Sequence, residues 1–168
     1  MKSDFESIVE AIPTLTGRER EILDKHLSVR PRTISLAIIE NDSGQLLVNP
    51  GFDPKRNLPF YRPIGGGTYH GEYTKDTVVR EFGEETGLVI EVRELLSVVE
   101  NIFTYTGRTG HEIMFLYRCV LQDVKAYTYE SIPVREEGRS VSQAVWKSIA
   151  EIRAEGAKLF PEQLLDIV

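Results

Sequence analysis

The sequence contains one cysteine, Cys119, and no apolar run that approaches the ~18 residues needed to span a membrane. A single cysteine excludes an intrachain disulfide, and the apolar residues around it, 113–121, predict a packed thiol. Acidic residues interrupt the amino-terminal stretch MKSDFESIVEAIP, where a signal peptide needs a continuous apolar core. We therefore expect a cytoplasmic protein in a reducing compartment, with no membrane partner.

Positive charge is also scarce in this chain. It has 20 lysines and arginines against 26 aspartates and glutamates, a formal net charge of −6, and no segment concentrates the basic residues. This balance repels a nucleic-acid backbone, so we expect no polymeric DNA or RNA partner. A small anionic substrate held through metal ions remains compatible with it. With 168 residues and 41% hydrophobic side chains, the chain fits one globular core.

The first thirty residues predict two short helices. Ser3 with Glu6 and Thr16 with Glu19 each fit a capping box. In this motif the hydroxyl of the first residue accepts a hydrogen bond from the backbone N–H of the glutamate, and the glutamate carboxylate accepts one from the backbone N–H of the first residue. Pro13 lies between the two boxes and separates the helices, because proline removes a helical hydrogen bond.

This helical extension, residues 1–30, is expected to precede a domain that spans residues 31–168. Residues 15–23 resemble the opening helix of a LuxR-type helix-turn-helix, but no second, recognition helix follows before the strand that begins near Thr33. DNA binding is therefore the minor alternative. We expect a packed extension or one that forms a homodimer, because an amphipathic helix needs an apolar surface to cover.

Alternating apolar residues predict a strand-rich domain after the extension. The predicted strands are residues 33–40, 45–49, 88–100, 111–121 and 142–146. The predicted connections are a turn at 41–44, a proline-containing surface loop at 49–59, a gap at 101–110 and two short closing helices at 148–155 and 161–167. Mixed strands that enclose one helix and are flanked by others predict an α/β (α+β) sandwich with a mixed sheet.

The enclosed helix is predicted at residues 74–86, between a glycine-rich turn and a helix-terminating glycine. Its acids Glu81, Glu84 and Glu85 are spaced i, i+3 and i+4, so three carboxylates share one face. They repel one another, and Arg80 compensates only part of the charge. A bound hard cation resolves the conflict, because Mg²⁺ and Mn²⁺ prefer carboxylate oxygens.

Two neighbouring features suit this helix to a ligand site. Val78, Val79 and Phe82 form an apolar side, so the helix can pack and still offer its acids. The preceding glycines, at 65–67, let the backbone come close to a ligand, and the Gly65 carbonyl can supply an oxygen to a metal.

The order of these residues matches a known motif. Every defined position of the Nudix box is matched, by Gly66, Glu72, Arg80, Glu81, Phe82, Glu84, Glu85, Gly87 and Leu88. With frequencies of about 5–7% for each fixed residue, chance agreement at a given start is on the order of one in a billion. The chain therefore resembles the Nudix hydrolase family over residues 66–88, and the strand pattern from about Thr33 onward resembles the family's sandwich.

The resemblance implies hydrolysis of a nucleoside diphosphate linked to another moiety, with Mg²⁺ or Mn²⁺ as the cofactor and a small nucleotide-type compound as the substrate. It implies that Glu81 and Glu85 are the firmest metal ligands, and that Glu84 is a further ligand or the base. The Gly65 carbonyl would complete the metal sphere, and Arg80 would hold Glu84 in orientation.

The resemblance defines the outer support and the general base less closely. Glu72 would support the loop or the outer metal shell. In parts of the family a glutamate from a late loop acts as the base, and Glu130, Glu136 and Glu137 stand at about that place before the last strand. Glu137 is the favoured candidate, and a solvated acidic loop is the alternative interpretation for all three.

Substrate specificity is expected from residues outside the box. Tyr105, seventeen residues after Leu88, resembles the downstream tyrosine of dinucleoside polyphosphate hydrolases, although cross-strand packing explains an aromatic residue there equally well. Arg56 and Arg62 are further predicted substrate contacts, with plain solvation as the alternative for Arg56. The proline that marks ADP-ribose hydrolases would fall near Phe103 and is missing, so the substrate stays open.

Two alternatives come from other functional classes. An isopentenyl-diphosphate isomerase on this fold requires a cysteine near the cleft, whereas Cys119 lies within an apolar strand. A nucleotide-sensing or regulatory module would recruit a partner through the helical extension and turn over slowly. The complete set of box acids argues against such a module, because a pure sensor does not need all of them.

Overall fold

The computed structural model describes residues 4–27, 30–136 and 141–168. Within these ranges the helices and strands, with η for a 3-10 helix, follow in the order α1 (Asp4–Ala11), η1 (Ile12–Thr14), α2 (Gly17–Leu27), β1 (Arg32–Ile38), β2 (Leu46–Asp53), β3 (Leu58–Arg62), β4 (Ile64–Gly67), α3 (Thr74–Thr86), β5 (Ile90–Tyr105), β6 (Arg108–Leu121), η2 (Val124–Thr128), β7 (Ser131–Val134), β8 (Ser142–Lys147), α4 (Ile149–Ala154), β9 (Lys158–Leu159) and η3 (Glu162–Asp166).

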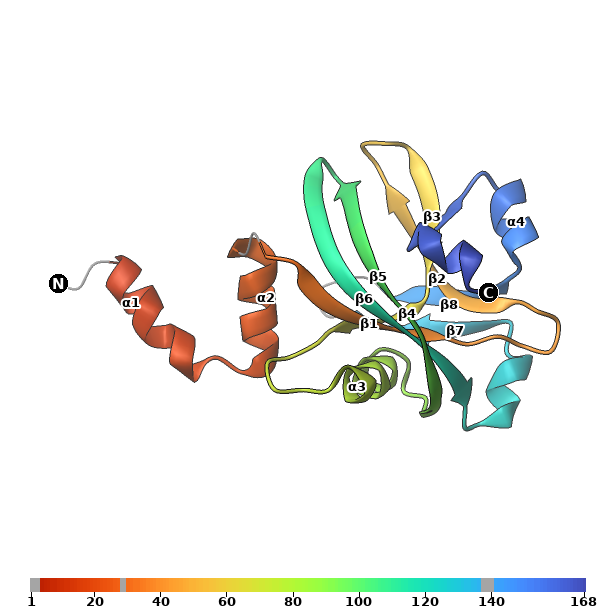
Figure 1. Ribbon diagram of the computed structural model, residues 1–168, viewed down its shortest axis with the longest axis horizontal. Coiled ribbons are helices and arrows are strands. Elements are labelled where there is room, and N and C mark those ends of the chain that lie inside the picture. The colour runs from red at the N-terminus through yellow and green to blue at the C-terminus, as the bar shows by residue number, and fades with distance from the viewer. Residues whose placement is uncertain (1–3, 28–29, 137–140) are drawn as a thin grey trace.

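Two mixed sheets form the centre of the domain (Figure 1). The first has the strand order β4-β1-β6-β5, in which β1 runs parallel to β6 and antiparallel to β4. The second has the order β7-β8-β2-β3-β9, in which β9 runs parallel to β3. The α+β sandwich predicted from the sequence is confirmed, and its strands are divided between two sheets.

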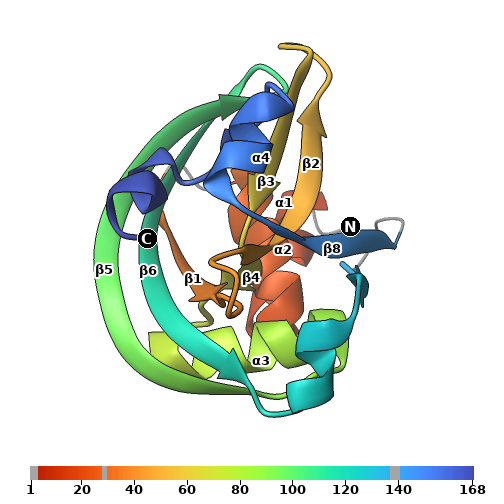
Figure 2. The ribbon, with the colours of Figure 1, turned by 90° about the vertical axis from the view of Figure 1, so that its right-hand side faces the viewer.

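The first sheet is covered on both faces, because neighbouring residues of β1 point to opposite sides. Ala37 joins an apolar cluster that contains Phe82 of α3. Leu36 joins a second cluster with Ile152 of α4 and Leu164 of η3. Figure 2 shows α3 on the lower and α4 on the upper side of the strands. The helix that carries the acids is thus fixed to one face of the sheet.

The glycines at 65–67, predicted as a turn, lie instead in strand β4, which leads toward the start of α3. It pairs antiparallel with β1, with Gly65 opposite Leu36 and Gly66 opposite Ser35. Gly65 has a φ of 145°, and a Cβ built there would lie 2.1 Å from the carbonyl oxygen of Ser35. Only glycine fits a backbone held so close to its neighbour. Helix α3 covers the predicted residues and ends at Gly87, whose φ of 72° is the left-handed conformation of a helix terminator.

The surface loop predicted at residues 49–59 is wrong, because this segment is a hairpin of β2 and β3. Pro50 and Pro59 are tolerated within the strands because each strand has a single partner there. β2 pairs with β8 only over residues 46–48, and β3 pairs with β9 only over residues 60–61. A proline lacks the N–H that a second partner would need, so it excludes a doubly paired position but not an edge position.

The gap predicted at residues 101–110 is also wrong. Strands β5 and β6 continue through it as one long antiparallel ribbon, closed by Thr106 and Gly107 with φ values of 50° and 79°. Two consecutive positive φ angles are typical of the tight turns that match strand twist. Three short strands, β4, β7 and β9, were not predicted, because two to four residues carry no readable alternation.

The amino-terminal extension forms the two helices that the sequence predicts. In the capping box of α2, the Thr16 N–H donates to Glu19 Oε2 at 2.8 Å and the Glu19 N–H donates to Thr16 Oγ1 at 3.3 Å. The other predicted box begins at Ser3, which lies outside the described residues. Helix α1 extends away from the domain, whereas α2 lies nearer to it (Figure 1). Among the described residues, no helix is long and apolar enough to cross a membrane.

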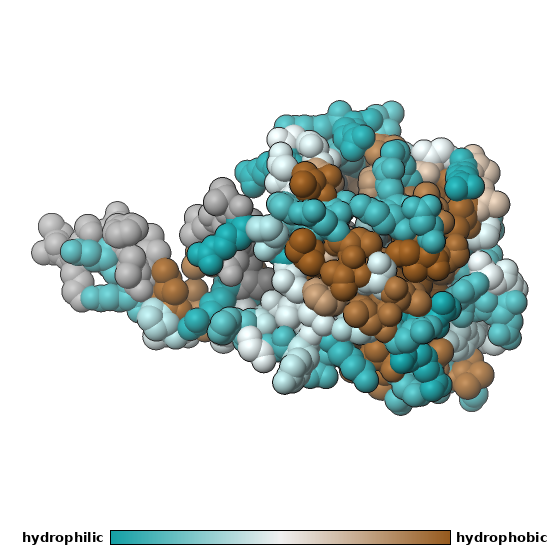
Figure 3. Space-filling view, in the orientation of Figure 1, coloured by the Kyte–Doolittle hydropathy of each residue, from teal (hydrophilic) through white to brown (hydrophobic). Residues whose placement is uncertain are grey.

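Part of the apolar surface lies over β5, an edge strand of the first sheet. Val98 and Ile102 are 47% and 65% exposed, and Figure 3 shows apolar atoms gathered over this ribbon. Exposed apolar residues on an edge strand are typical of contact surfaces. The homodimer expected from the sequence stays a prediction.

Replacement of Phe82 by alanine should lower the free energy of unfolding by about 3–5 kcal/mol, because the ring is fully buried between α3 and the first sheet. Urea denaturation followed by circular dichroism measures the change. Val79→Ala on the same helix is the control, since Val79 is 37% exposed, and should cost less than about 1 kcal/mol. A loss in Phe82→Ala no larger than in the control would contradict the packing of α3.

Candidate active site

The guanidinium of Arg80 lies at the centre of a network of acids. Its Nε and Nη2 donate to the two carboxylate oxygens of Glu72, at 2.8 and 3.0 Å. Its Nη1 donates to Glu81 Oε1 at 2.8 Å and to Glu84 Oε2 at 3.1 Å. Nη2 also donates to the carbonyl oxygen of Gly67 at 3.0 Å. One side chain thereby joins three carboxylates to the end of β4.

Tyr69 and Glu72 hold the turn before α3 against this guanidinium. The Cζ of Arg80 lies 4.0 Å from the centroid of the Tyr69 ring, which is a cation–π contact. Glu72 accepts hydrogen bonds from the Tyr69 N–H at 3.1 Å and from the Thr77 hydroxyl at 3.0 Å. The hydrogen bonds from Arg80 lower the pKa of Glu72, against the opposing effect of partial burial. Burial alone would lower the pKa of Arg80, but its bonds to Glu72 and Glu81 outweigh burial and raise it.

Glu81 is buried against Gly66 of β4, with 3% of its side chain exposed. A Cβ built on Gly66 would lie 2.4 Å from Glu81 Oε2, so the carboxylate occupies the space that any side chain at this position would fill. The glycine of β4 therefore makes room for the acid of α3.

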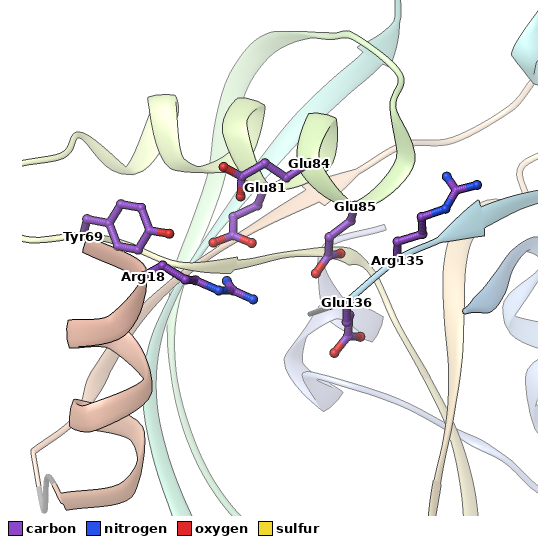
Figure 4. Close-up of a pocket in the computed structure, with 7 residues that line it drawn as sticks. All are labelled: Arg18, Tyr69, Glu81, Glu84, Glu85, Arg135 and Glu136. Carbon is purple, nitrogen blue, oxygen red and sulfur yellow. The ribbon is translucent and has the colours of Figure 1, made fainter. Parts of the chain in front are cut away.

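Beside the network lies a pocket of about 360 Å³ (Figure 4). The lining is strongly charged, with four glutamates, two arginines and one tyrosine. These residues are Arg18, Tyr69, Glu81, Glu84, Glu85, Arg135 and Glu136. The three acids of the predicted helix face thus line one pocket, together with a fourth acid from the segment after β7.

Glu85 shows how poorly the negative charge of the pocket is compensated. Burial raises the pKa of Glu85 to about 8. Arg62 and Arg18 oppose this rise, whereas the charges of Glu136 and Glu81 add to it. Glu136 itself pairs with Arg62, whose Nη2 lies 2.6 Å from Glu136 Oε1. A further positive charge in the pocket would favour the ionised form of Glu85.

The donor chemistry of the pocket suits a hard divalent cation, because its acids offer carboxylate oxygens. In the described part of the chain, no three His, Cys, Asp or Glu side chains are arranged so that they could hold a metal ion. Arg80 Nη1 donates to the carboxylates of both Glu81 and Glu84, so these two groups are directed toward the guanidinium. Glu84 is 54% exposed and has room to turn. The pocket thus offers oxygen donors of the kind that a hard cation binds, but three of them do not converge in this arrangement.

Three residues predicted to contact the substrate do not line the pocket. Tyr105 packs edge-on against Phe60 and donates its hydroxyl to a backbone carbonyl of β2 at 3.4 Å. Arg56 is exposed in the turn between β2 and β3. Arg62 is connected to the pocket through its ion pair with Glu136. The cross-strand packing weighed for Tyr105 is therefore present, and substrate contacts by all three residues stay predictions.

The other predicted residues lie in separate parts of the chain. Glu137, the favoured base, lies outside the described residues. Glu130 is exposed and does not line the pocket. Gly65 is buried in β4, and its role as a carbonyl ligand stays a prediction. Cys119 is packed in the core, as expected, where burial raises the pKa of its thiol to about 12.

Arg18 and Arg135 line the pocket although the sequence did not single them out. The Arg135 N–H donates to the carbonyl oxygen of Glu85 at 2.8 Å, which ties the segment after β7 to the end of α3. Arg18 comes from α2, on the other side of the pocket (Figure 4). No local pattern connects either residue with α3. The one available signal is that Arg135 directly precedes Glu136, one of the late acids considered as a base.

Comparison with known proteins places most of the chain in one family. The sequence model of the NUDIX domain matches residues 29–166. An ADP-ribose pyrophosphatase of Methanocaldococcus jannaschii is 34% identical over 84 residues, which are 48% of this chain and 47% of that protein. The chain therefore spans about half the length of this curated relative.

Solved structures share the fold. A NUDIX hydrolase from Nitrosomonas europaea superposes with a TM-score of 0.56 and 23% identity, over 82% of this chain and 86% of that chain. A UDP-X diphosphatase superposes with a TM-score of 0.57 and 17% identity, over 98% of this chain and 76% of that chain. At these identities the likeness shows the fold alone.

Replacement of Arg80 by lysine should lower the free energy of unfolding by about 2–4 kcal/mol, because lysine loses hydrogen bonds to carboxylates that are worth about 1.5–3 kcal/mol each. Lysine keeps the charge but cannot bond to three carboxylates and a carbonyl from one planar group. Urea denaturation measures the loss. The control is Arg118→Lys, because Arg118 is 43% exposed and pairs with the exposed Glu94. Equal stabilities of the two variants would show that the network does not stabilise the turn.

Proposed function

The chain belongs to the NUDIX family, and from this membership we propose that it hydrolyses a pyrophosphate bond in a nucleoside diphosphate linked to another moiety, with a divalent cation as cofactor. One observation carries the proposal: the carboxylates of Glu81, Glu84 and Glu85 line one pocket beside the Arg80 network. Hydrolysis of a phosphoanhydride requires neutralisation of the charge on its oxygens and activation of a water molecule. An acidic pocket that gathers cations supports both requirements.

Glu81 and Glu85 are the proposed ligands of Mg²⁺ or Mn²⁺, with the Gly65 carbonyl as a further ligand. When bound, the cation would neutralise phosphate charge and lower the pKa of a water molecule. Two features support the assignment. Gly66 leaves space for the Glu81 carboxylate, and Glu85 is a buried acid whose ionised form a cation would stabilise.

Glu84 is the proposed general base, which would take a proton from the attacking water. It is 54% exposed, and Arg80 Nη1 donates to its Oε2 at 3.1 Å, so the carboxylate is oriented without being buried. Glu136 is the competing acid in the pocket, but Arg62 already engages one of its oxygens at 2.6 Å. Glu137, favoured in the sequence analysis, remains the alternative base.

The proposed substrate is a small nucleotide-type compound with a diphosphate between two groups. The names of two similar proteins, ADP-ribose pyrophosphatase and UDP-X diphosphatase, support this class. Such a compound carries one group on each side of its diphosphate. For Tyr105 or Arg56 to contact the substrate, one of these groups would have to extend to the tips of the β2–β3 and β5–β6 hairpins.

The alternatives from the sequence analysis are less well supported. An isomerase would need a cysteine at the pocket, whereas Cys119 is 2% exposed within the core. A nucleotide-sensing module would keep the pocket but turn over slowly, and an enzyme assay separates it from a hydrolase. We also retain a cytoplasmic location and a homodimer as proposals from the sequence.

Incubation of the full chain with Mg²⁺ and a panel of diphosphate compounds tests the proposed reaction. The panel contains ADP-ribose, diadenosine polyphosphates, nucleoside triphosphates, nucleotide sugars and coenzyme A, with products resolved by chromatography. We expect cleavage of at least one compound between two phosphorus atoms, and no cleavage in EDTA. If none is cleaved, the sensor function replaces the hydrolase.

Replacement of Glu85 by glutamine should reduce turnover by orders of magnitude, because an amide oxygen is a weaker ligand for a hard cation than a carboxylate. The thermal midpoint in EDTA should stay almost unchanged, since glutamine has the shape of the acid and brings no charge into a buried site. Glu91→Gln is the control, because Glu91 is 49% exposed and pairs with Arg93 on β5, outside the pocket. Wild-type activity of Glu85→Gln with Mg²⁺ would refute the metal assignment.

A further inference from the structure

The start of α2 is held in one orientation by its own side chains. The capping box between Thr16 and Glu19 closes the first turn, and the Thr16 hydroxyl also donates to Glu19 Oε2 at 2.8 Å. Arg20 donates to the carbonyl oxygens of Leu15 and Pro13 at 3.2 and 2.9 Å, which fastens the preceding segment to the same turn. A side chain on this turn therefore leaves the helix in a defined direction.

Gly17 brings this turn into contact with the site. A Cβ built on Gly17 would lie 3.3 Å from Cδ2 of Tyr69, so the backbone of α2 passes directly over the edge of that ring. Tyr69 also carries the Arg80 guanidinium at 4.0 Å from its centroid. The start of α2 thus lies close to a residue that contacts Arg80 and lines the pocket.

Arg18 extends from this turn into the acidic pocket. Figure 4 shows its side chain running from α2 toward the space between Glu81 and Glu85. Arg18 lines the pocket with them, and its positive charge acts to lower the pKa of Glu85. Its guanidinium is therefore within electrostatic range of the acids proposed to hold the cation.

We infer that Arg18 binds a phosphate group of the substrate. Arg18 lies outside residues 29–166, which the NUDIX model matches, so a segment that precedes the matched domain completes the active site. The inference rests on the proposed function. A diphosphate must enter a pocket lined by four glutamates, which repel it. The positive charge of Arg18 within the pocket offsets part of this repulsion.

Arginine suits this task because its planar guanidinium can donate two parallel hydrogen bonds to phosphate oxygens. Arg135 lines the pocket from the opposite side. A diphosphate bound by Arg18 would lie against the acids of α3 and a cation held by them. The amino-terminal helices then serve as part of the binding site for the diphosphate, and the chemical class of the ligand is a nucleoside diphosphate derivative.

Isothermal titration of the full chain with α,β-methylene-ADP in Mg²⁺ tests the inference, because this probe keeps the diphosphate charge and cannot be cleaved at the methylene bridge. Arg18→Gln should weaken binding about 10- to 100-fold, the effect of losing a charged hydrogen bond. Arg18→Lys keeps the charge and should recover part of the affinity. Arg93→Gln, which removes one positive charge from an exposed pair outside the pocket, should bind as the wild type does.

Titration with Mn²⁺ alone, followed by electron paramagnetic resonance, separates a phosphate contact from an effect on the metal. Arg18→Gln should bind Mn²⁺ as tightly as the wild type or more tightly, because the change removes a positive charge from the pocket. Weaker Mn²⁺ binding in this variant, or equal binding of the nucleotide probe by Arg18→Gln and wild type, would overturn the inference alone. No binding of the probe by the wild type would also overturn the inference, whereas the proposed function is overturned only if no compound of the panel is cleaved.

Discussion

The arrangement of the acidic pocket depends on one guanidinium, that of Arg80. Helix geometry alone would set Glu81 and Glu84 against each other as like charges. The guanidinium of Arg80 offsets this repulsion because it donates hydrogen bonds to both carboxylates. It also donates two hydrogen bonds to the carboxylate of Glu72. Because the same group reaches the carbonyl of Gly67, the helix and the end of β4 are fastened in one relative position. The apolar side of α3, centred on Phe82, offsets the cost of gathering this charge.

Those parts of the fold that depend on residues close together in the sequence could be predicted from it. The bounds of α3 and its termination at Gly87 follow from a local turn and one glycine, and the box that begins α2 follows from Thr16 and Glu19. The hairpin tips could not be read in this way. Pro50 alone predicts a loop, and it fits a strand only because β8 does not pair with β2 as far as this residue. The continuation of β5 and β6 depends on pairing between the two strands.

The same distinction applies to the site. The helical period placed Glu81, Glu84 and Glu85 on one face because their spacing is a property of one element, and they do line one pocket. Arg18 and Arg135 belong to elements that meet α3 only through tertiary packing, so no spacing along the chain connects them with the acids. A motif identifies what one helix offers, whereas the opposite walls of a pocket come from contacts that only the folded chain defines.

The parallel pairing of β1 with β6 has a kinetic consequence. The first paired residues of the two strands are Arg32 and Glu112, which lie 80 positions apart in the sequence. Parallel strands need the whole intervening crossover before they can pair, and pairing over such a separation is slow. During synthesis α3 leaves the ribosome well before β6, the strand that completes the sheet beneath it. The face of the sheet that supports α3 is therefore completed late, after the helix that carries the acids has been synthesised.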